Sequence, residues 1–300
     1  MELRILQYFL AVAREQSISA AAESLHLSQP TLSIQLKALE EELGKQLLIR
    51  GTKGSRKVLL TDEGMILRKR AEEILTLVQK AKSEVQMTDA SIAGDVYIGA
   101  GETDIIRYFA RAAKRMKKSC PDIRYHISSG NAQFVTEQLD KGLIDFGLMY
   151  GPVDRTKYEA LTLPIGDRFG VLMRRDDSLA QKEWISPEEL RDKPLILSAQ
   201  DRSEGWTVSS QIRQDVSHLN VAATYNLIFN ASLMVEEGLG YAVCLDKLIN
   251  TSGDSQLCFL PLRPEIVITP SIVWKRYQVF SKASERFLQE LTSVMDLPQK

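Results

Sequence analysis

The first 44 residues carry apolar side chains at helical intervals. In the opening segment these side chains recur every three or four residues: Leu3, Leu6, Phe9, Leu10 and Ala13. This period predicts an amphipathic helix over residues 2–15. The alanines at 20–22, followed by Leu25, form the small-residue face of a second helix, for which Ser19 is the predicted N-cap. Small side chains let that helix approach its neighbour closely.

A third helix is predicted to run to Leu43 and to end at Gly44. Ser28 is a favourable N-cap, and Pro30 fits the first turn because no amide partner is needed there. The predicted buried stripe is Leu32, Leu36, Leu39 and Leu43. The polar positions left for solvent or DNA are Gln29, Thr31, Ser33, Gln35 and Lys37. Two helices joined by a short turn, the second opening with polar side chains, are typical of a helix offered to the DNA major groove.

The next segment predicts a β-hairpin wing. Two short apolar stretches, 47–49 and 58–60, enclose a loop that contains Gly51 and Gly54. The basic residues of this region, among which no acidic residue occurs, are Lys45, Arg50, Lys53, Arg56 and Lys57. A basic run is more often a solvated surface than a nucleic-acid site, and this one gains weight from the helices before it.

A long helix is predicted after the wing. Thr61 caps it, and Asp62 and Glu63 lie in its first turn, where the helix dipole favours acids. Its apolar positions follow a heptad pattern: Leu67, Ala71, Ile74, Val78, Ala81 and Val85. The helix either packs on its own domain or joins two copies of the chain. A rod of roughly 27 residues and about 40 Å is too long for a domain of this size to bury, which favours the dimer.

Beyond a small-residue joint at residues 91–94, strands and helices alternate, which predicts an α/β domain, doubly wound. The predicted strands are 96–100, 123–128, 144–149, 161–174, 194–199, 241–245 and 267–274. The predicted helices are 103–118, 132–141, 203–216, 231–237 and 281–295.

Composition limits where DNA can bind. The chain of 300 residues has 38 basic and 39 acidic side chains, a net charge of −1, so a DNA-binding surface must be local. The N-terminus is too short and too charged for a signal peptide, and no apolar run approaches the ~18 residues that span a bilayer. The three scattered cysteines are typical of reduced, mostly buried thiols. We therefore expect a cytoplasmic protein without a membrane partner.

The chain resembles the LysR-type transcriptional regulators over essentially its full length. The motifs that carry the resemblance are Phe9-Leu10-Ala11-Val12-Ala13, Ser19-Ala20-Ala21-Ala22-Glu23-Ser24-Leu25, Leu27-Ser28-Gln29-Pro30-Thr31-Leu32-Ser33, Leu39-Glu40-Glu41-Glu42-Leu43-Gly44 and Leu60-Thr61-Asp62-Glu63-Gly64. Looser matches are Gly142-Leu143-Ile144-Asp145-Phe146-Gly147-Leu148 and Glu237-Gly238-Leu239-Gly240-Tyr241-Ala242. Two positions depart from the family pattern: Ile34 replaces a commonly polar or basic residue, and Gly51 replaces a second arginine.

The resemblance implies an α/β protein with three parts. Residues 1–61 would be a winged helix-turn-helix domain, 62–90 a linker and dimerisation helix, and 91–300 an effector-binding domain like a periplasmic binding protein. In that domain one lobe would comprise 92–161 and 266–300, and the other 162–265. The family's partners would be double-stranded DNA with an interrupted palindromic operator, a second copy in a dimer or homotetramer, and RNA polymerase.

The DNA contacts are expected early on the third helix. Gln29 suits a bidentate pair with adenine, Pro30 and Thr31 suit a thymine methyl, and Ser33 suits a base or phosphate. A surface glutamine of no special function is the plain alternative for Gln29. The full set of predicted DNA-binding residues is Ser28, Gln29, Pro30, Thr31, Ser33, Lys37, Arg50, Lys53, Arg56 and Lys57. Lys53 is the candidate for the minor groove.

Effector contacts are expected where strands end and helices begin. The predicted residues are Gly101, Glu102, Thr103, Ser128, Ser129, Asn131, Ser198, Gln200, Arg202, Phe229 and Asn230. Their hydroxyls and amides suit a small organic anion, with Arg202 or Arg107 as countercharge. Glu102 would repel an anion unless it pairs with an arginine or the effector carries an amine.

Catalysis is not expected, nor is a cofactor or metal. The pairs Gly99/Gly101 and Gly238/Gly240 lack the third glycine of a dinucleotide-binding loop, and the three histidines lie far apart in the sequence. The alternative to a regulator is a small-molecule binding protein, or an amino-acid-binding enzyme, with an appended helix-turn-helix. DNA binding distinguishes the two.

Overall fold

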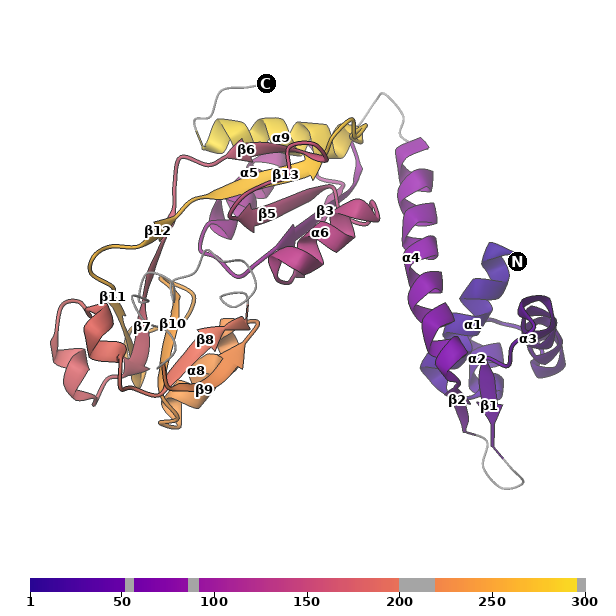
Figure 1. Cartoon of the computed structure of the whole chain (residues 1–300). Coiled ribbons are helices and arrows are strands. Elements are labelled where there is room, and N and C mark those ends of the chain that lie inside the picture. The colour runs from indigo at the N-terminus through magenta and orange to yellow at the C-terminus, as the bar shows by residue number, and fades with distance from the viewer. Residues whose placement is uncertain (52–56, 86–91, 200–218, 296–300) are drawn as a thin grey trace. The chain divides into compact units, whose positions relative to one another are not determined.

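The computed structural model describes residues 1–51, 57–85, 92–199 and 219–295, and the chain divides into two compact units, Met1–Gln86 and Met87–Lys300. The elements of the first unit are α1 (Leu3–Glu15), α2 (Ile18–Ser24), α3 (Gln29–Leu43), β1 (Leu48–Arg50), β2 (Val58–Leu60) and α4 (Asp62–Val85). Strands β1 and β2 pair in an antiparallel hairpin, so the predicted helices and wing are confirmed (Figure 1).

The core of the first unit lies among α1, α2, α3 and the hairpin. Its buried side chains include Phe9, Val12, Ala21, Leu32 and Leu36. Leu39 completes the α3 stripe, but the prediction for Leu43 is wrong. That side chain is 41% exposed, because it is the last residue of α3 and the chain turns away at Gly44 (φ 63°).

The N-cap predicted for α2 is also wrong. Ser17, not Ser19, lies in the extended conformation that precedes the helix, and its side chain accepts a hydrogen bond from the Ala20 amide at 3.3 Å. The helix begins earlier because Ile18 packs against the unit's core. Ser19 consequently lies within the first turn.

Helix α4 begins against the wing. The Thr61 hydroxyl accepts a hydrogen bond from the Gly64 amide at 3.0 Å, as a cap does, and donates to the Gln46 carbonyl at 2.7 Å. A side chain at Gly64 would place its Cβ 2.2 Å from the Leu47 carbonyl oxygen, so this turn requires glycine.

The heptad positions of α4 lie in two different environments. Ala71 is buried and Leu67 packs on the core of the first unit, as the plain alternative for this helix expected. From Ile74 onward the heptad positions lie outside that core, and Val85 is 85% exposed. The second half of the helix therefore has an apolar seam that lies outside the core of its own unit.

The second unit contains two sheets, which we call lobe 1 and lobe 2 together with the helices that cover them. The lobe 1 sheet has the order β4-β3-β5-β13-β6. Its strands are β3 (Gly94–Ala100), β4 (Ile123–Ser129), β5 (Phe146–Tyr150), β6 (Tyr158–Thr162) and β13 (Pro270–Lys275). Its helices are α5 (Ile106–Met116), α6 (Ala132–Asp140) and α9 (Lys282–Val294). Strand β3 runs parallel to β4 and β5, and β13 is antiparallel to β5 and β6.

Both faces of the lobe 1 sheet are covered. On one face, Phe109 of α5 and Phe287 of α9 pack with Ile98 of β3. On the other, Val135 and Leu139 of α6 are buried. The lobe 1 sheet thus packs between helices on both of its faces, as a doubly wound arrangement requires.

The lobe 2 sheet has the order β11-β7-β10-β8-β9, with β12 also paired to β7. Its strands are β7 (Asp167–Arg174), β8 (Leu195–Ser198), β9 (Val221–Tyr225), β10 (Tyr241–Leu245), β11 (Leu257–Pro261) and β12 (Val267–Ile268). Helix α8 (Ile228–Glu236) covers one face, and two short 3₁₀ helices comprise Ser178–Gln181 and Pro187–Leu190. Strands β9 and β11 were not predicted, and the helix predicted for 203–216 lies outside the described residues.

The chain passes between the lobes twice. It crosses from β6 to β7 and returns from β12 to β13 (Figure 1). Cys120 and Cys244 are buried, and burial raises the pKa of the Cys244 thiol to about 12, so it stays protonated at neutral pH.

Candidate nucleic-acid interface and effector pocket

The first turns of α3 present an exposed surface opposite the buried stripe. Gln29, Pro30 and Thr31 are exposed, and Ser33 is half-buried. Ser28 is exposed too, but its hydroxyl accepts from the Thr31 amide at 3.3 Å and bonds with the Thr31 hydroxyl at 2.7 Å. Ser28 therefore caps the helix, and a base contact would compete with that cap.

An apolar side chain lies in the middle of this surface. Ile34 is 66% exposed, and Ala38, one turn later, is exposed as well. Lys37 lies beside them and pairs with Glu41 at 3.5 Å, with both side chains largely exposed. A pair so exposed contributes little to stability, so Lys37 can exchange it for a phosphate.

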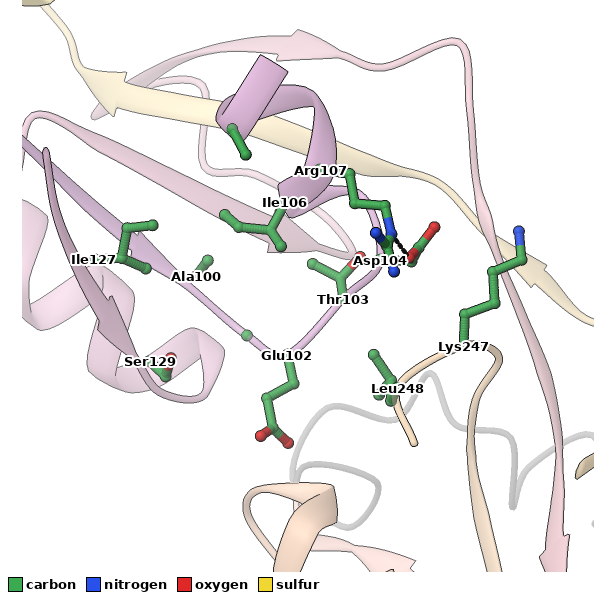
Figure 2. Close-up of a pocket in the computed structure, with 12 residues that line it drawn as sticks. Ala100, Glu102, Thr103, Asp104, Ile106, Arg107, Ile127, Ser129, Lys247 and Leu248 are labelled. Atoms are coloured by element: carbon green, nitrogen blue, oxygen red, sulfur yellow. Dashed lines mark hydrogen bonds and ion pairs between the residues drawn. The ribbon is translucent and has the colours of Figure 1, made fainter. Parts of the chain in front are cut away.

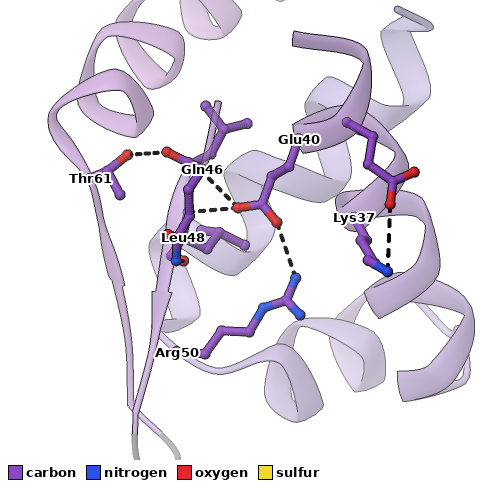
Figure 3. A network of polar contacts seen from close by, with 8 residues as sticks. Lys37, Glu40, Gln46, Leu48, Arg50 and Thr61 are labelled. Atoms are coloured by element: carbon purple, nitrogen blue, oxygen red, sulfur yellow. Dashed lines mark hydrogen bonds and ion pairs between the residues drawn. The ribbon is translucent and has the colours of Figure 1, made fainter. Parts of the chain in front are cut away.

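Glu40 connects α3 to the wing (Figure 3). Its Oε1 accepts hydrogen bonds from the amides of Leu47, at 2.8 Å, and Leu48, at 3.0 Å. Its Oε2 pairs with Arg50 at 3.2 Å. The Glu40 side chain is 14% exposed, so the contact is shielded from solvent. One carboxylate thus sets the position of β1 and holds the Arg50 guanidinium near the C-terminal half of α3.

The other predicted wing contacts are only partly described. Lys57 is exposed next to β2. Lys53 and Arg56 lie outside the described residues.

A hollow of about 400 Å³ lies between lobe 1 and the loop after β10 of lobe 2 (Figure 2). Of the predicted effector residues, those that line it are Gly101, Glu102, Thr103 and Ser129. Those that do not are Ser128, Asn131, Ser198, Phe229 and Asn230. Gln200 and Arg202 lie outside the described residues. The expectation that effector contacts lie where strands end therefore identified the residues on one side of this hollow.

The hollow is also lined by residues that the sequence did not predict as effector contacts: Ala100, Asp104, Ile106, Ala110, Ile127, Lys247 and Leu248. Arg107, considered only as a countercharge, lines it as well and pairs with Asp104. Lys247 and Leu248 follow β10, and no polar motif distinguishes them. A helix-period count on α5 would have identified Ile106 and Ala110 as neighbours on one helix surface.

Two predicted residues are committed to other contacts. Thr103 is buried, and its hydroxyl donates to Asp167 at 2.5 Å and accepts from the Ile105 amide at 3.0 Å. The Tyr150 hydroxyl also donates to Asp167, and burial together with that carboxylate raises the Tyr150 pKa. Asn131 caps α6 by accepting from the Phe134 amide at 2.8 Å. These polar groups position the backbone and are not available to a ligand without loss of those bonds.

Glu102 makes a contact across the lobes. Its Oε2 accepts a hydrogen bond from the amide of Ile228, the first residue of α8, at 2.5 Å. Leu227, the residue before the helix, has no side-chain cap of its own. Phe229 (62% exposed) and Asn230 lie on the exposed side of the same turn.

A second hollow, of about 710 Å³, is lined by α6 and by Met149, Tyr150 and Pro152. It is larger, but the described residues that line it belong to lobe 1 and include none of the predicted effector residues. The hollow between the lobes is the better candidate for a ligand site because both lobes contribute to it.

Residues 3–65 match the model of bacterial regulatory helix-turn-helix proteins of the lysR family, and residues 89–296 match that of the LysR substrate binding domain. The chain belongs to the LysR family. It is 33% identical to the regulator AlsR of Bacillus subtilis over 206 residues, 69% of this chain and 66% of that protein. It is 27% identical to BsdA of the same organism over 296 residues, 96% and 99% of the two chains.

Solved structures have the same fold. Full-length CbnR in complex with its target DNA matches with a TM-score of 0.72 and 19% identity, over 98% of this chain and 100% of that one. Full-length OxyR of Pseudomonas aeruginosa, a variant, matches with a TM-score of 0.56 and 25% identity, over 98% and 99%. This LysR-family chain is a DNA-binding transcriptional regulator with an effector-binding domain, and the family is not enzymatic. Among its described residues no helix is long and apolar enough to cross a membrane.

Proposed function

We propose that this regulator reads its operator through the first turns of α3 and contacts the phosphates through the wing. The observation that carries the proposal is the exposure of Gln29, Pro30 and Thr31 on a helix whose opposite side is fixed by Leu32 and Leu36. Because packing fixes the inner side of this helix, its exposed side chains keep one orientation toward the major groove. The basic residues Lys53, Arg56 and Lys57 supply charge for the flanking phosphates.

The second half of α4 supports a proposal for assembly. Its heptad positions from Ile74 to Val85 lie outside the core of their own unit. We infer that they pair with the same helix of a second copy, which makes the operator an interrupted palindrome. Two such dimers form a tetramer that contacts RNA polymerase. The domains divide at 1–61, 62–90 and 91–300, and the protein acts in the cytoplasm, where its DNA is.

The hollow between the lobes is the proposed effector site. A small organic molecule bound there contacts lobe 1 through Gly101 and Ser129 and lobe 2 through Lys247 and Leu248. It changes the regulator only to the extent that it binds one arrangement of the lobes better than another.

A gel-shift titration with DNA from the gene's own upstream region tests the DNA-reading proposal. Gln29→Ala is expected to lose about 1–3 kcal/mol of discrimination at one base position, because a bidentate pair with adenine is lost. Gln7→Ala, an exposed glutamine on α1, is the matched control and is expected to bind as the wild type does. Unchanged sequence preference in Gln29→Ala contradicts the assignment. Failure of the wild type to bind at low salt contradicts the whole proposal.

A further inference from the structure

Glu102 occupies the place where an anionic effector would be expected to bind. The N-terminus of α8 faces lobe 1, and its first amide, that of Ile228, already donates to the Glu102 carboxylate. A helix N-terminus attracts negative charge because its amides are unpaired and its dipole is positive there. Here lobe 1 supplies that negative charge itself, on the loop between β3 and α5.

A free anion would have to displace this carboxylate. The displaced Glu102 would remain beside the anion, because the Ile228 amide lies within hydrogen-bond distance of the Glu102 carboxylate, and two like charges a few ångströms apart repel. The bond that the anion gained at Ile228 would only replace the one that Glu102 lost. The α8 N-terminus therefore does not favour an anionic ligand.

The remaining polar groups of the hollow divide into two ends (Figure 2). On one side Arg107 of lobe 1 pairs with Asp104, and Lys247 extends from the loop after β10 of lobe 2. On the other side is Glu102. Within the described part of the chain, its Oε2 bonds to Ile228 while Oε1 has no hydrogen bond. Oε1 can therefore accept a bond from a ligand without disturbing the cap of α8.

Among the residues that the structure describes, those that form the walls between the two ends are apolar. The side chains that form them are Ala100, Ile106, Ala110, Ile127 and Leu248. Ile127 is 53% exposed although it lies on a strand, which leaves apolar surface for a ligand to cover. The exposed Ser129 adds a hydroxyl. An aliphatic body with one charged hydrogen-bond donor matches these walls and this carboxylate.

We propose that the hollow binds a small molecule with a cationic nitrogen, an ammonium or amidinium on an aliphatic body, and that it excludes simple carboxylates. Glu102 Oε1 accepts from the cation while Oε2 keeps the Ile228 amide, so the ligand strengthens an existing bridge between the lobes. A zwitterion is accepted too, because its ammonium binds Glu102 while its acidic group faces Lys247, whereas a simple carboxylate has no ammonium for Glu102. This inference rests on the proposed effector site and replaces the anion expected from the sequence.

Three probes of nearly equal size test the proposal on the full-length protein: pentylamine, pentanoate and 5-aminopentanoate. Thermal unfolding and titration calorimetry at neutral pH and matched ionic strength are expected to show binding of the two amines and none of pentanoate. Glu102→Gln keeps an acceptor for Ile228 but loses the charge, so it is expected to weaken amine binding about tenfold or more. Circular dichroism confirms that the variant is folded. The control Glu183→Gln removes an exposed carboxylate outside the hollow and is expected to bind the amines as the wild type does.

Three results overturn the proposal: pentanoate binding as tightly as pentylamine, an undiminished amine response in Glu102→Gln, or no amine response in the wild type. The variant Ala110→Trp fills the hollow and distinguishes two cases: a wrong ligand charge at a correct effector site, and a wrong effector site. If pentanoate binds and Ala110→Trp abolishes its binding, the hollow is the effector site and only the ligand charge is wrong. If no probe binds while the operator gel shift succeeds, the effector site fails as well.

Discussion

At the scale of single residues, Ile34 is an apolar side chain on the surface proposed to contact DNA. It is 66% exposed and lies between Thr31 and Ala38 on the outer side of α3. The family commonly has a polar or basic residue at this position. An isoleucine cannot bond to a base edge, but it can cover the methyl group of a thymine, which only the major groove presents.

Replacing the contacted thymine by deoxyuridine is therefore expected to weaken binding by the wild type by about 0.8 kcal/mol, roughly fourfold in Kd. The uracil lacks only the methyl group, so hydrogen bonding is unchanged. A scan of thymines in the operator by fluorescence anisotropy measures this loss. In Ile34→Ala the same replacement is expected to cost little, whereas the control Leu3→Ala, exposed on α1, behaves as the wild type. An equal loss in Ile34→Ala contradicts the contact.

Asp95 of β3 forms a second notable group of side chains, away from the hollow. Arg124 donates to its two oxygens at 2.9 and 3.0 Å, and His126 lies 2.7 Å from Oδ1. The ring of His126 stacks on Tyr97 with centroids 4.6 Å apart. Burial alone would raise the Asp95 pKa, but the hydrogen bonds and charges of Arg124 and His126 outweigh it and hold the pKa below its ordinary value of 3.8.

A carboxyl whose pKa is lower in the folded state stabilises the fold above its unfolded pKa and loses that contribution as pH falls. The thermal midpoint of the Met87–Lys300 unit is therefore expected to fall between about pH 5 and pH 3 more steeply in the wild type than in Asp95→Asn. Calorimetry over this pH range measures the difference. The exposed Asp122→Asn serves as the control and is expected to keep the wild-type slope. Parallel profiles for wild type and Asp95→Asn would show that the lowered pKa carries no stability.

At the scale of elements, the wing depends on one carboxylate of α3. Glu40 accepts from the amides of Leu47 and Leu48, and both of these residues are buried. Side chain and wing are only seven or eight residues apart in sequence, but the helix must be complete before they meet. The position of the wing consequently depends on α3, and a change in one of them alters the other.

Glu40→Ala is expected to destabilise the wing by about 1–3 kcal/mol, because it leaves two buried amides without an acceptor. Amide hydrogen exchange at Leu47 and Leu48, followed by NMR, is expected to accelerate accordingly. Glu40→Gln keeps one acceptor oxygen, so its exchange rates should lie between those of the wild type and of Glu40→Ala. Glu41→Ala removes an exposed neighbour and should leave the exchange unchanged. Equal protection in Glu40→Ala would mean that strand pairing alone holds the wing.

The elements also show what sequence can predict. Ser28, Gly44 and Thr61 were placed correctly because a cap and its helix are adjacent in the chain. Two serines compete before α2, and local pattern chose Ser19, whereas the packing of Ile18 selects Ser17.

The lining of the proposed effector pocket was predicted only in part. Gly101 and Ser129 follow from strand ends, and Lys247 and Leu248 also come after a predicted strand, 241–245, but no polar motif distinguishes that loop. The partner of Glu102 is 126 residues away, and no local pattern identifies it.

At the scale of the whole molecule, the seam on α4 continues where the core of the first unit ends. Leu67 and Ala71 are used within that unit, and Ile74 and Val78 are not part of its core. A helix that is apolar on an uncovered side tends to acquire a partner, and heptad spacing favours another helix.

Val78→Glu is expected to shift the protein from dimers or larger species towards monomers, because it places a charge in the seam. Sedimentation velocity over a range of concentrations measures this shift. Gln79→Glu adds the same charge at the neighbouring exposed position and should leave the distribution unchanged. Identical profiles for Val78→Glu and the wild type would exclude α4 as the contact between copies.

The bond between Glu102 and Ile228 also has an evolutionary consequence. One base change turns a glutamate codon into a codon for glutamine or lysine. The first would neutralise the carboxylate of the hollow and the second would reverse its charge, while the apolar walls and both sheets stay as they are. A descendant of this regulator could therefore acquire a signal of opposite charge in one mutational step, before its operator changed.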